Sequence, residues 1–211
     1  MIERYTRPEM GVVWDPENKF SKMLEVEVAV ARVQASLKII PRSAAAQIAA
    51  KGKFSIQRIL EIEKQTKHDV IAFVSNVAEN VGEQGRFVHF GLTSSDVLDT
   101  AFSLQIREAG VVLSKSLDFL EKALKNIIRK HADTLCAGRT HGMFAEPTTF
   151  GFKMAGFLEE FERHRQRIDA ALKQIAIAKL SGAVGTYSSQ SPMVEEKVAK
   201  LLKLTPETVA T

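Results

Sequence analysis

The 211-residue sequence contains one cysteine, Cys136, together with one tryptophan and six prolines. A single cysteine excludes an intrachain disulfide and favours a reducing compartment. No run reaches about 18 apolar residues, so the sequence predicts no transmembrane helix. Residues 1–10 are charged and lack the apolar core of a secretory signal. We therefore expect a cytoplasmic protein with no membrane partner.

Motifs of several functional classes are also missing. No GxxxxGK[ST] loop and no GxGxxG after a strand is present, so phosphate-cradling nucleotide loops are not predicted. The absence of HExxH and of any Cys/His cluster argues against a metal site. Lys and Arg number 29 against 25 Asp and Glu, with no basic run of five or more, so no nucleic-acid partner is predicted. The slight basic excess is compatible with an anionic ligand.

Apolar residues follow helical spacing along almost the whole chain, and no segment alternates convincingly as a strand. Asp15-Pro16 is typical of a helix start, and Pro41 is predicted to end that helix. Further helices are expected near 43–51, over 55–66, and from the segment after residue 69 to Gly82. The sequence therefore predicts an all-α protein.

Two long helices dominate the second half of the chain. From Ser95 to about Lys130, apolar residues recur in alternating steps of four and three, which is the heptad pattern of a long packed helix. The same pattern predicts a second long helix near 149–177. A polar loop over 137–147 is predicted between them, and a short last helix over 195–204. Two antiparallel helices cannot bury both apolar faces against each other, so we expect other chains or further residues to cover the remaining faces. An oligomer is favoured, and a monomeric four-helix bundle is the alternative. The predicted domains are 1–91, small and helical, and 92–211, the first part of a long-helix bundle.

Four polar segments at element boundaries are candidate site segments: Arg4-Tyr5, Lys67-His68-Asp69, Thr93-Ser94-Ser95-Asp96 and Gly138-Arg139-Thr140-His141-Gly142. The segment Lys67-His68-Asp69 has two interpretations. Either Asp69 caps the following helix, or Lys67, His68 and the helix N-terminus form an anion-binding or proton-transfer site. The segment 93–96 is either an ordinary helix N-cap or a site where hydroxyls and free backbone N–H groups bind a carboxylate or phosphate.

His141 is the candidate general acid–base, because an imidazole suits proton transfer near neutral pH and flanking glycines allow a ligand close approach. The alternative is an ordinary solvent-exposed loop histidine. We expect His89 to be a hydrogen-bonded loop residue, His131 and His164 to be structural, and Cys136 to be a small buried thiol and not a nucleophile.

Five segments, in order, closely resemble the bacterial-type adenylosuccinate lyase family of the fumarase/aspartase superfamily. They are residues 1–10 with Trp14, Lys67-His68-Asp69-Val70, the run 89–101 (HFGLTSSDVLDTA), the run 138–147 (GRTHGMFAEP) and the run 179–187 (KLSGAVGTY). The match spans the whole chain, and the Lys-His-Asp and Arg-Thr-His-Gly forms favour this family over argininosuccinate lyase or fumarase.

The resemblance implies a fumarase/aspartase-like elongated helical bundle and a lyase of purine nucleotide biosynthesis. It would cleave adenylosuccinate to AMP and fumarate, and SAICAR to AICAR and fumarate, by β-elimination, with no metal or organic cofactor and as a homotetramer. The implied substrate contacts are Arg4, Tyr5, Lys67, His68, Asp69, Thr93 and Ser94. His141 would transfer the proton to the leaving nitrogen, and His68 is a second candidate acid or a phosphate ligand.

One departure accompanies this resemblance. Members of the family are longer, and their mobile loop with the serine base, of Ser-Ser-x-x-Met-Pro-x-Lys type, is not found in these 211 residues. We therefore expect an N-terminal portion of such an enzyme, inactive alone. The alternatives are a non-catalytic helical assembly module and another fumarate-releasing lyase such as argininosuccinate lyase.

Overall fold

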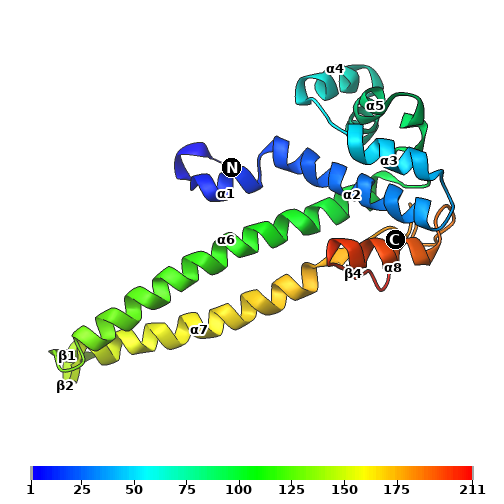
Figure 1. Ribbon diagram of the computed structural model, residues 1–211. Helices are drawn as coiled ribbons and strands as arrows, with labels where there is room; N and C mark the ends of the chain where they lie inside the picture. The colour runs from blue at the N-terminus through cyan, green and yellow to red at the C-terminus, as the bar shows by residue number, and fades with distance from the viewer. Residues whose placement is uncertain (1, 211) are drawn as a thin grey trace. The chain divides into compact units, whose positions relative to one another are not determined.

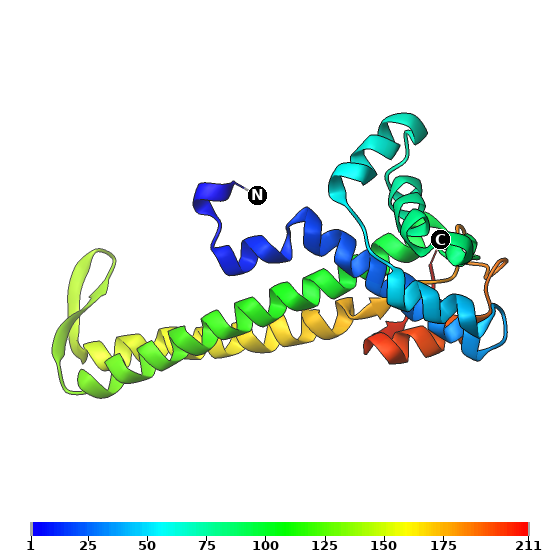
Figure 2. The same ribbon diagram turned by 45° about the horizontal axis from the view of Figure 1, so that its top comes forward.

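The computed structural model describes residues 2–210 and consists mainly of helices (Figures 1 and 2). The chain forms two compact units. The first contains the residues up to Glu108 and those from Ile175 onward, and the second is Ala109–Gln174. Helix α6 (Ser94–Lys130) runs from the first unit into the second. The predicted all-α class is confirmed, and the domain boundary at residue 91 stays a prediction.

The first unit is built from short and medium helices around a common core. Its elements are η1 (Glu3–Tyr5), α1 (Pro8–Val13), α2 (Pro16–Ser36), α3 (Arg42–Lys51), α4 (Ile56–Thr66), α5 (Asp69–Val81), η2 (Gly82–Phe87), the start of α6, β3 (Ile177–Ala178), α8 (Pro192–Leu202) and β4 (Thr205–Pro206). Strands β3 and β4 form a short parallel pair. Helix α2 packs against α3 and α8, and α4 packs against α5.

The helix boundaries in this unit follow from local sequence signals. The Asp15 carboxylate accepts a hydrogen bond from the Glu17 N–H (2.9 Å) with Pro16 at the first helical position, as predicted. Ser55 likewise caps α4. The prediction that Pro41 ends α2 is wrong: α2 ends at Ser36, because Lys38 takes a left-handed φ of 62° and the Ile39 N–H returns to the Gln34 carbonyl.

The second unit is a pair of long helices. The C-terminal part of α6 and helix α7 (Phe150–Ile175) lie side by side and antiparallel in both views (Figures 1 and 2). The two long helices predicted from the heptad pattern are confirmed. They approach closely at Gly151, where a Cβ would lie 2.7 Å from the His131 carbonyl oxygen. Arg165 joins them by hydrogen-bonded ion pairs to Glu121 (2.7 Å) and Asp118 (2.8 Å).

The predicted loop over 137–147 is a β-hairpin, so that prediction is wrong. Strands β1 (Leu135–Thr140) and β2 (Met143–Thr149) pair antiparallel, and a two-residue turn of His141 and Gly142 joins them. Both turn residues have positive φ, 51° and 73°, as type I′ hairpin turns require. The register shifts between Ala137 and Arg139, and this bulge interrupts the alternation that would have indicated a strand.

Candidate functional site

Two helix N-termini of the first unit bring His68 and Ser94 together. His68 is the N-cap of α5, and its Nδ1 accepts a hydrogen bond from the Ile71 N–H (3.4 Å). The opposite ring nitrogen, Nε2, lies 3.5 Å from the Ser94 Oγ at the start of α6. Because Nδ1 acts as an acceptor, a neutral ring carries its proton on Nε2, which then points at the serine hydroxyl. Two helix N-termini, a hydroxyl and an imidazole therefore meet at a place suited to an anion.

Asp96 fixes the backbone at the start of α6. Its Oδ2 accepts a hydrogen bond from the Thr93 N–H (2.9 Å), and the Thr93 carbonyl accepts one from the Asp96 N–H (3.0 Å). The bond from the Thr93 N–H to the Asp96 carboxylate is one half of a capping box, in which the acidic residue at the third helical position reaches back, and the backbone carbonyl of Thr93 takes the place of the usual side-chain acceptor. Ser94 and Ser95 are thereby held in the first turn with their hydroxyls free of the capping role.

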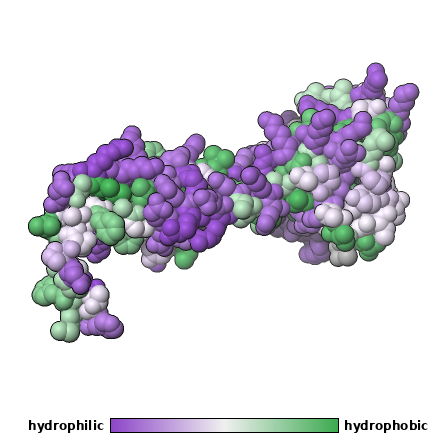
Figure 3. Space-filling model, turned by 90° about the horizontal axis from the view of Figure 1, so that it is seen from below, coloured by the Kyte–Doolittle hydropathy of each residue, from purple (hydrophilic) through white to green (hydrophobic). Residues whose placement is uncertain are grey.

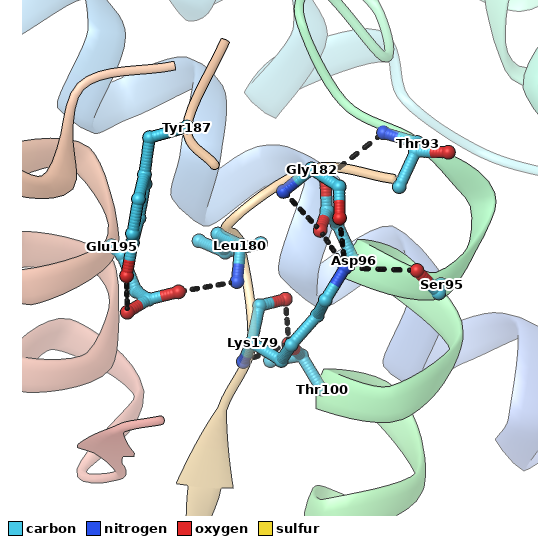
Figure 4. Close-up of polar contacts among 9 residues, drawn as sticks. All are labelled: Thr93, Ser95, Asp96, Thr100, Lys179, Leu180, Gly182, Tyr187 and Glu195. Carbon is cyan, nitrogen blue, oxygen red and sulfur yellow. Dashed lines mark hydrogen bonds and ion pairs between the residues drawn. The ribbon is translucent and has the colours of Figure 1, made fainter. Parts of the chain in front are cut away.

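A second segment, 179–187, packs behind this turn (Figure 4). The Lys179 ammonium lies 2.8 Å from the Asp96 Oδ1 and 2.9 Å from the Ser95 Oγ, and it also donates to the Gly182 carbonyl. The Gly182 N–H donates to the same Asp96 oxygen (3.1 Å). Asp96 is fully buried and the Lys179 side chain is 7% exposed, so each compensates the desolvated charge of the other.

Glu195 supports the same segment from helix α8. Its carboxylate accepts hydrogen bonds from the Leu180 N–H (2.6 Å) and from the Tyr187 hydroxyl (2.7 Å), as Figure 4 shows. Burial of the phenol, then the hydrogen bond and the negative charge of Glu195, raise the pKa of Tyr187 to about 12. Tyr187 is therefore neutral at physiological pH and acts as a hydrogen-bond donor.

The loop between η2 and α6 is held by buried polar side chains. The Glu27 carboxylate, 2% exposed, accepts from the His89 N–H (2.9 Å) and lies 2.7 Å from the His89 Nδ1. The Phe90 carbonyl accepts from the amides of Gln34 (2.7 Å) and Gln190 (2.9 Å). The prediction that His89 is a hydrogen-bonded loop residue is confirmed, and these bonds fix the chain that leads into Thr93.

The remaining predicted residues of the first unit lie at its surface. Lys67 is exposed and ends α4 in a left-handed conformation, with φ 55°. Asp69 is exposed; its Oδ1 accepts from the Val70 N–H (2.8 Å) and lies 3.6 Å from the His68 Nδ1, so the N-cap is His68 and not Asp69. In η1, the Arg4 guanidinium stacks 4.8 Å from the Tyr5 ring centroid. Among residues 2–210, no hydrogen bond joins Arg4, Tyr5 or Lys67 to His68 or Ser94.

His141 belongs to the second unit, where it is exposed at the tip of the β1–β2 hairpin. It thus lies in a two-residue hairpin turn and not in the polar loop that the sequence predicts. His131 and His164 make local contacts on the long helices, to Thr134 (3.2 Å) and to Glu160 (3.4 Å), in keeping with structural roles.

Comparison with known proteins assigns this arrangement to a family. A family model described as a lyase matches residues 3–211. The chain belongs to this lyase family. Over its whole length it is 49% identical to an adenylosuccinate lyase of Synechocystis sp. and 50% identical to that of Aquifex aeolicus. The Bacillus subtilis adenylosuccinate lyase is 44% identical over the same span. The resemblance inferred from the five motifs is therefore confirmed.

Solved lyase structures share the fold. A fumarate lyase from Mesorhizobium sp. BNC1 superposes with a TM-score of 0.90 at 34% identity, over 95% of this chain and 49% of that one. The 3-carboxy-cis,cis-muconate lactonizing enzyme from Pseudomonas putida gives 0.88 at 32% identity, over 97% of this chain and 49% of that one. The chain also covers 49% of each of the three adenylosuccinate lyases, so it spans about half the length of the curated relatives it matches.

The sequence patterns of this lyase-family chain indicate the candidate site segments, but they assign no role to the buried residues that support these segments. Asp96 is predicted only as a member of the segment 93–96, with no role of its own, and Lys179 only as part of the matching run 179–187. The usable signal was Lys179 itself, a lysine directly after the apolar run 175–178 (IAIA), where burial requires an anionic partner.

An apolar cavity of about 560 Å³ also lies in the first unit, lined by Trp14 at the end of α1 and by residues of α2 and α6 that include Phe20 and Phe102. None of the predicted site residues lines it. In the part of the chain that the structure describes, no three His, Cys, Asp or Glu side chains gather as metal ligands, and no helix is long and apolar enough to cross a membrane.

Proposed function

We propose that this chain is the N-terminal half of an adenylosuccinate lyase. The full-length protein would cleave adenylosuccinate to AMP and fumarate, and SAICAR to AICAR and fumarate. The observation that carries the proposal is the 43–50% identity, over the whole chain, to five adenylosuccinate lyases. The convergence of His68 and Ser94 at two helix N-termini supports it, because the substrate carries a phosphate and two carboxylates.

The proposed reaction is a β-elimination. A base removes the proton from the carbon next to a carboxylate, those electrons form the double bond of fumarate, and the C–N bond breaks. The nitrogen of the departing AMP then takes up a proton. Removal of the first proton builds negative charge on the carboxylate, which preorganised N–H and O–H donors stabilise. Ser94, the α6 N-terminus and His68 would supply such donors, and Arg4, Tyr5, Lys67, Asp69 and Thr93 would complete the substrate contacts.

We assign the proton transfer to the leaving nitrogen to His141. Exposure of this residue on a two-residue turn supports the assignment, because the paired strands on both sides define the backbone that presents the imidazole. The second unit also exposes large apolar side chains of α6 and α7, among them Val111 (55%), Phe119 (74%) and Phe152 (75%), and Figure 3 shows apolar surface on its hairpin-bearing end, at the left. This surface supports our proposal that the full-length protein is a homotetramer, which light scattering would measure. We also propose that the protein is cytoplasmic.

The test is a substrate profile of the full-length protein. We expect turnover of adenylosuccinate and SAICAR, followed by ultraviolet absorbance, and none of argininosuccinate. Turnover of argininosuccinate alone would assign the chain to another lyase of the family. No turnover and no binding of AMP or fumarate would favour a non-catalytic assembly module. The 211-residue chain alone is expected to be inactive.

The role of His141 is tested in the same enzyme. We expect His141→Ala to lower kcat by about 10²–10⁴-fold, the usual contribution of a positioned acid or base. His164→Ala is the matched control, since His164 is half exposed on α7 and its hydrogen-bonding contacts, to Glu160 and Arg167, are with its own helix. Full turnover by His141→Ala would remove this residue from the mechanism.

A further inference from the structure

Lys179 is a buried lysine to which the proposed chemistry gives no role. Its ammonium has three N–H groups, and the structure gives each of them an acceptor: the Asp96 Oδ1 (2.8 Å), the Ser95 Oγ (2.9 Å) and the Gly182 carbonyl. With its side chain only 7% exposed, Lys179 has no N–H group left for a ligand. It is therefore not placed to bind an anion or to donate a proton to substrate.

The three acceptors belong to two segments that are far apart in the sequence. Ser95 and Asp96 start helix α6, whereas Gly182 lies in the loop after β3 (Figure 4). Asp96 completes the connection, since its carboxylate accepts from the N–H groups of both Thr93 (2.9 Å) and Gly182 (3.1 Å). Three of these hydrogen bonds, from Lys179 to Asp96 and Ser95 and from the Gly182 N–H to Asp96, thus tie the start of α6 to the loop behind it.

The backbone of Lys179 is fixed as well. Thr100, fully buried and one turn further along α6 than Asp96, accepts from the Lys179 N–H and donates to the Lys179 carbonyl, both at 3.1 Å. The lysine is therefore held against α6 at its backbone and at its ammonium. Neither end can shift along the helix without breaking buried hydrogen bonds, which are costly to leave unmade.

Stability alone does not call for an ion pair at this position. A buried salt bridge is often no more stabilising than a well-packed apolar pair of the same volume. An apolar pair, however, could not direct the Thr93 N–H, the Ser95 hydroxyl and the Gly182 loop. We propose that Lys179, acting through Asp96 and Ser95, is a positioning residue that sets the geometry of the Thr93–Ser94 substrate contacts. For the reaction itself, this inference rests on the proposed function.

The kinetic test uses full-length enzyme with Lys179→Met, Asp96→Asn and the double variant, all assayed below their unfolding temperatures. We expect kcat/KM for adenylosuccinate to fall by about 10²-fold in Lys179→Met, the loss that a misplacement of about 1 Å can cause. Each single variant should also have a lowered Tm, and the double variant should recover much of that Tm because no charge is left unpaired. The double variant should nevertheless keep the low kcat/KM. Lys197→Met, at an exposed position on α8, is the control and should behave as wild type.

Two results would overturn the inference. One is a Lys179→Met enzyme with wild-type kcat/KM. The other is a double variant in which kcat/KM recovers together with Tm, since activity that follows stability indicates a structural role only.

A second measurement is independent of the reaction. In the full-length protein, amide hydrogen exchange of Thr93 and Gly182 should be slow. Lys179→Met should accelerate it at both positions by roughly tenfold or more, while Lys197→Met should not. Unchanged exchange at both amides would refute the positioning role. A full-length enzyme that does not cleave adenylosuccinate would refute the proposed function, but this exchange result would still decide whether Lys179 sets the turn.

Discussion

Two glycines of helix α7 should respond in opposite directions to the same substitution. A Cβ at Gly151 would lie 2.7 Å from the His131 carbonyl oxygen, 2.8 Å from that of Ile128 and 2.9 Å from the Ala132 Cα. All three are backbone atoms of the last turn of α6 or of the two residues after it, so relief requires the backbone there or the start of α7 to move. A Cβ at Gly156 would meet nothing within 4 Å. Gly151→Ala therefore overpacks a helix crossing, and Gly156→Ala only gains helix propensity.

The magnitudes follow from these contacts. Overpacking costs about 1–3 kcal/mol, and replacing glycine by alanine inside a helix gains up to about 1 kcal/mol. We expect Gly151→Ala to lower the free energy of unfolding by about 1–2 kcal/mol and Gly156→Ala to raise it by about 0.5–1 kcal/mol. At about 2–4 °C per kcal/mol for a chain of this length, the two Tm values should differ by roughly 3–12 °C. Thermal unfolding followed by circular dichroism measures this. A Gly151→Ala chain as stable as wild type would refute the close approach of the helices.

Two further predictions concern stability. The folded pKa of Tyr187 is raised to about 12 from 10.0, so its hydrogen bond to Glu195 stabilises the protein below pH 10 and is lost as pH rises through 12. Urea unfolding at pH 8 to 12 measures the difference in the free energy of unfolding between wild type and Tyr187→Phe. We expect this difference to shrink above pH 10, and a difference that stays constant would contradict the prediction. Asp15→Ala should lower the free energy of unfolding by about 1 kcal/mol, because the cap of α2 is lost. An unchanged urea midpoint at pH 7 would show that this cap contributes nothing.

Features that depend on neighbouring residues could be predicted from the sequence. The caps at Asp15 and Ser55 require only a short polar side chain before a helical pattern, and the heptad seams of the two long helices repeat often enough to be recognised. The candidate segments at 67–69 and 93–96 were found for the same reason, since each lies where a helix begins. Helix ends were less predictable, as the left-handed Lys38 that terminates α2 carries no glycine signal.

Features that depend on distant residues could not be predicted. The Asp96–Lys179 pair joins positions 83 residues apart, and nothing near either residue specifies the other. The β1–β2 hairpin was missed because its bulge breaks the period-two pattern and because its turn has histidine, not asparagine or aspartate, before Gly142. Convergence of His68 with Ser94 depends on the packing of two helices and not on either segment alone.

The most direct measurement is the identity of the products that the full-length protein releases from adenylosuccinate, followed by proton NMR. We predict fumarate and AMP in equal amounts, because elimination breaks the bond between nitrogen and the succinyl carbon. Release of aspartate would show hydrolysis on the purine side of that nitrogen and would contradict the proposed chemistry, as would an unchanged spectrum.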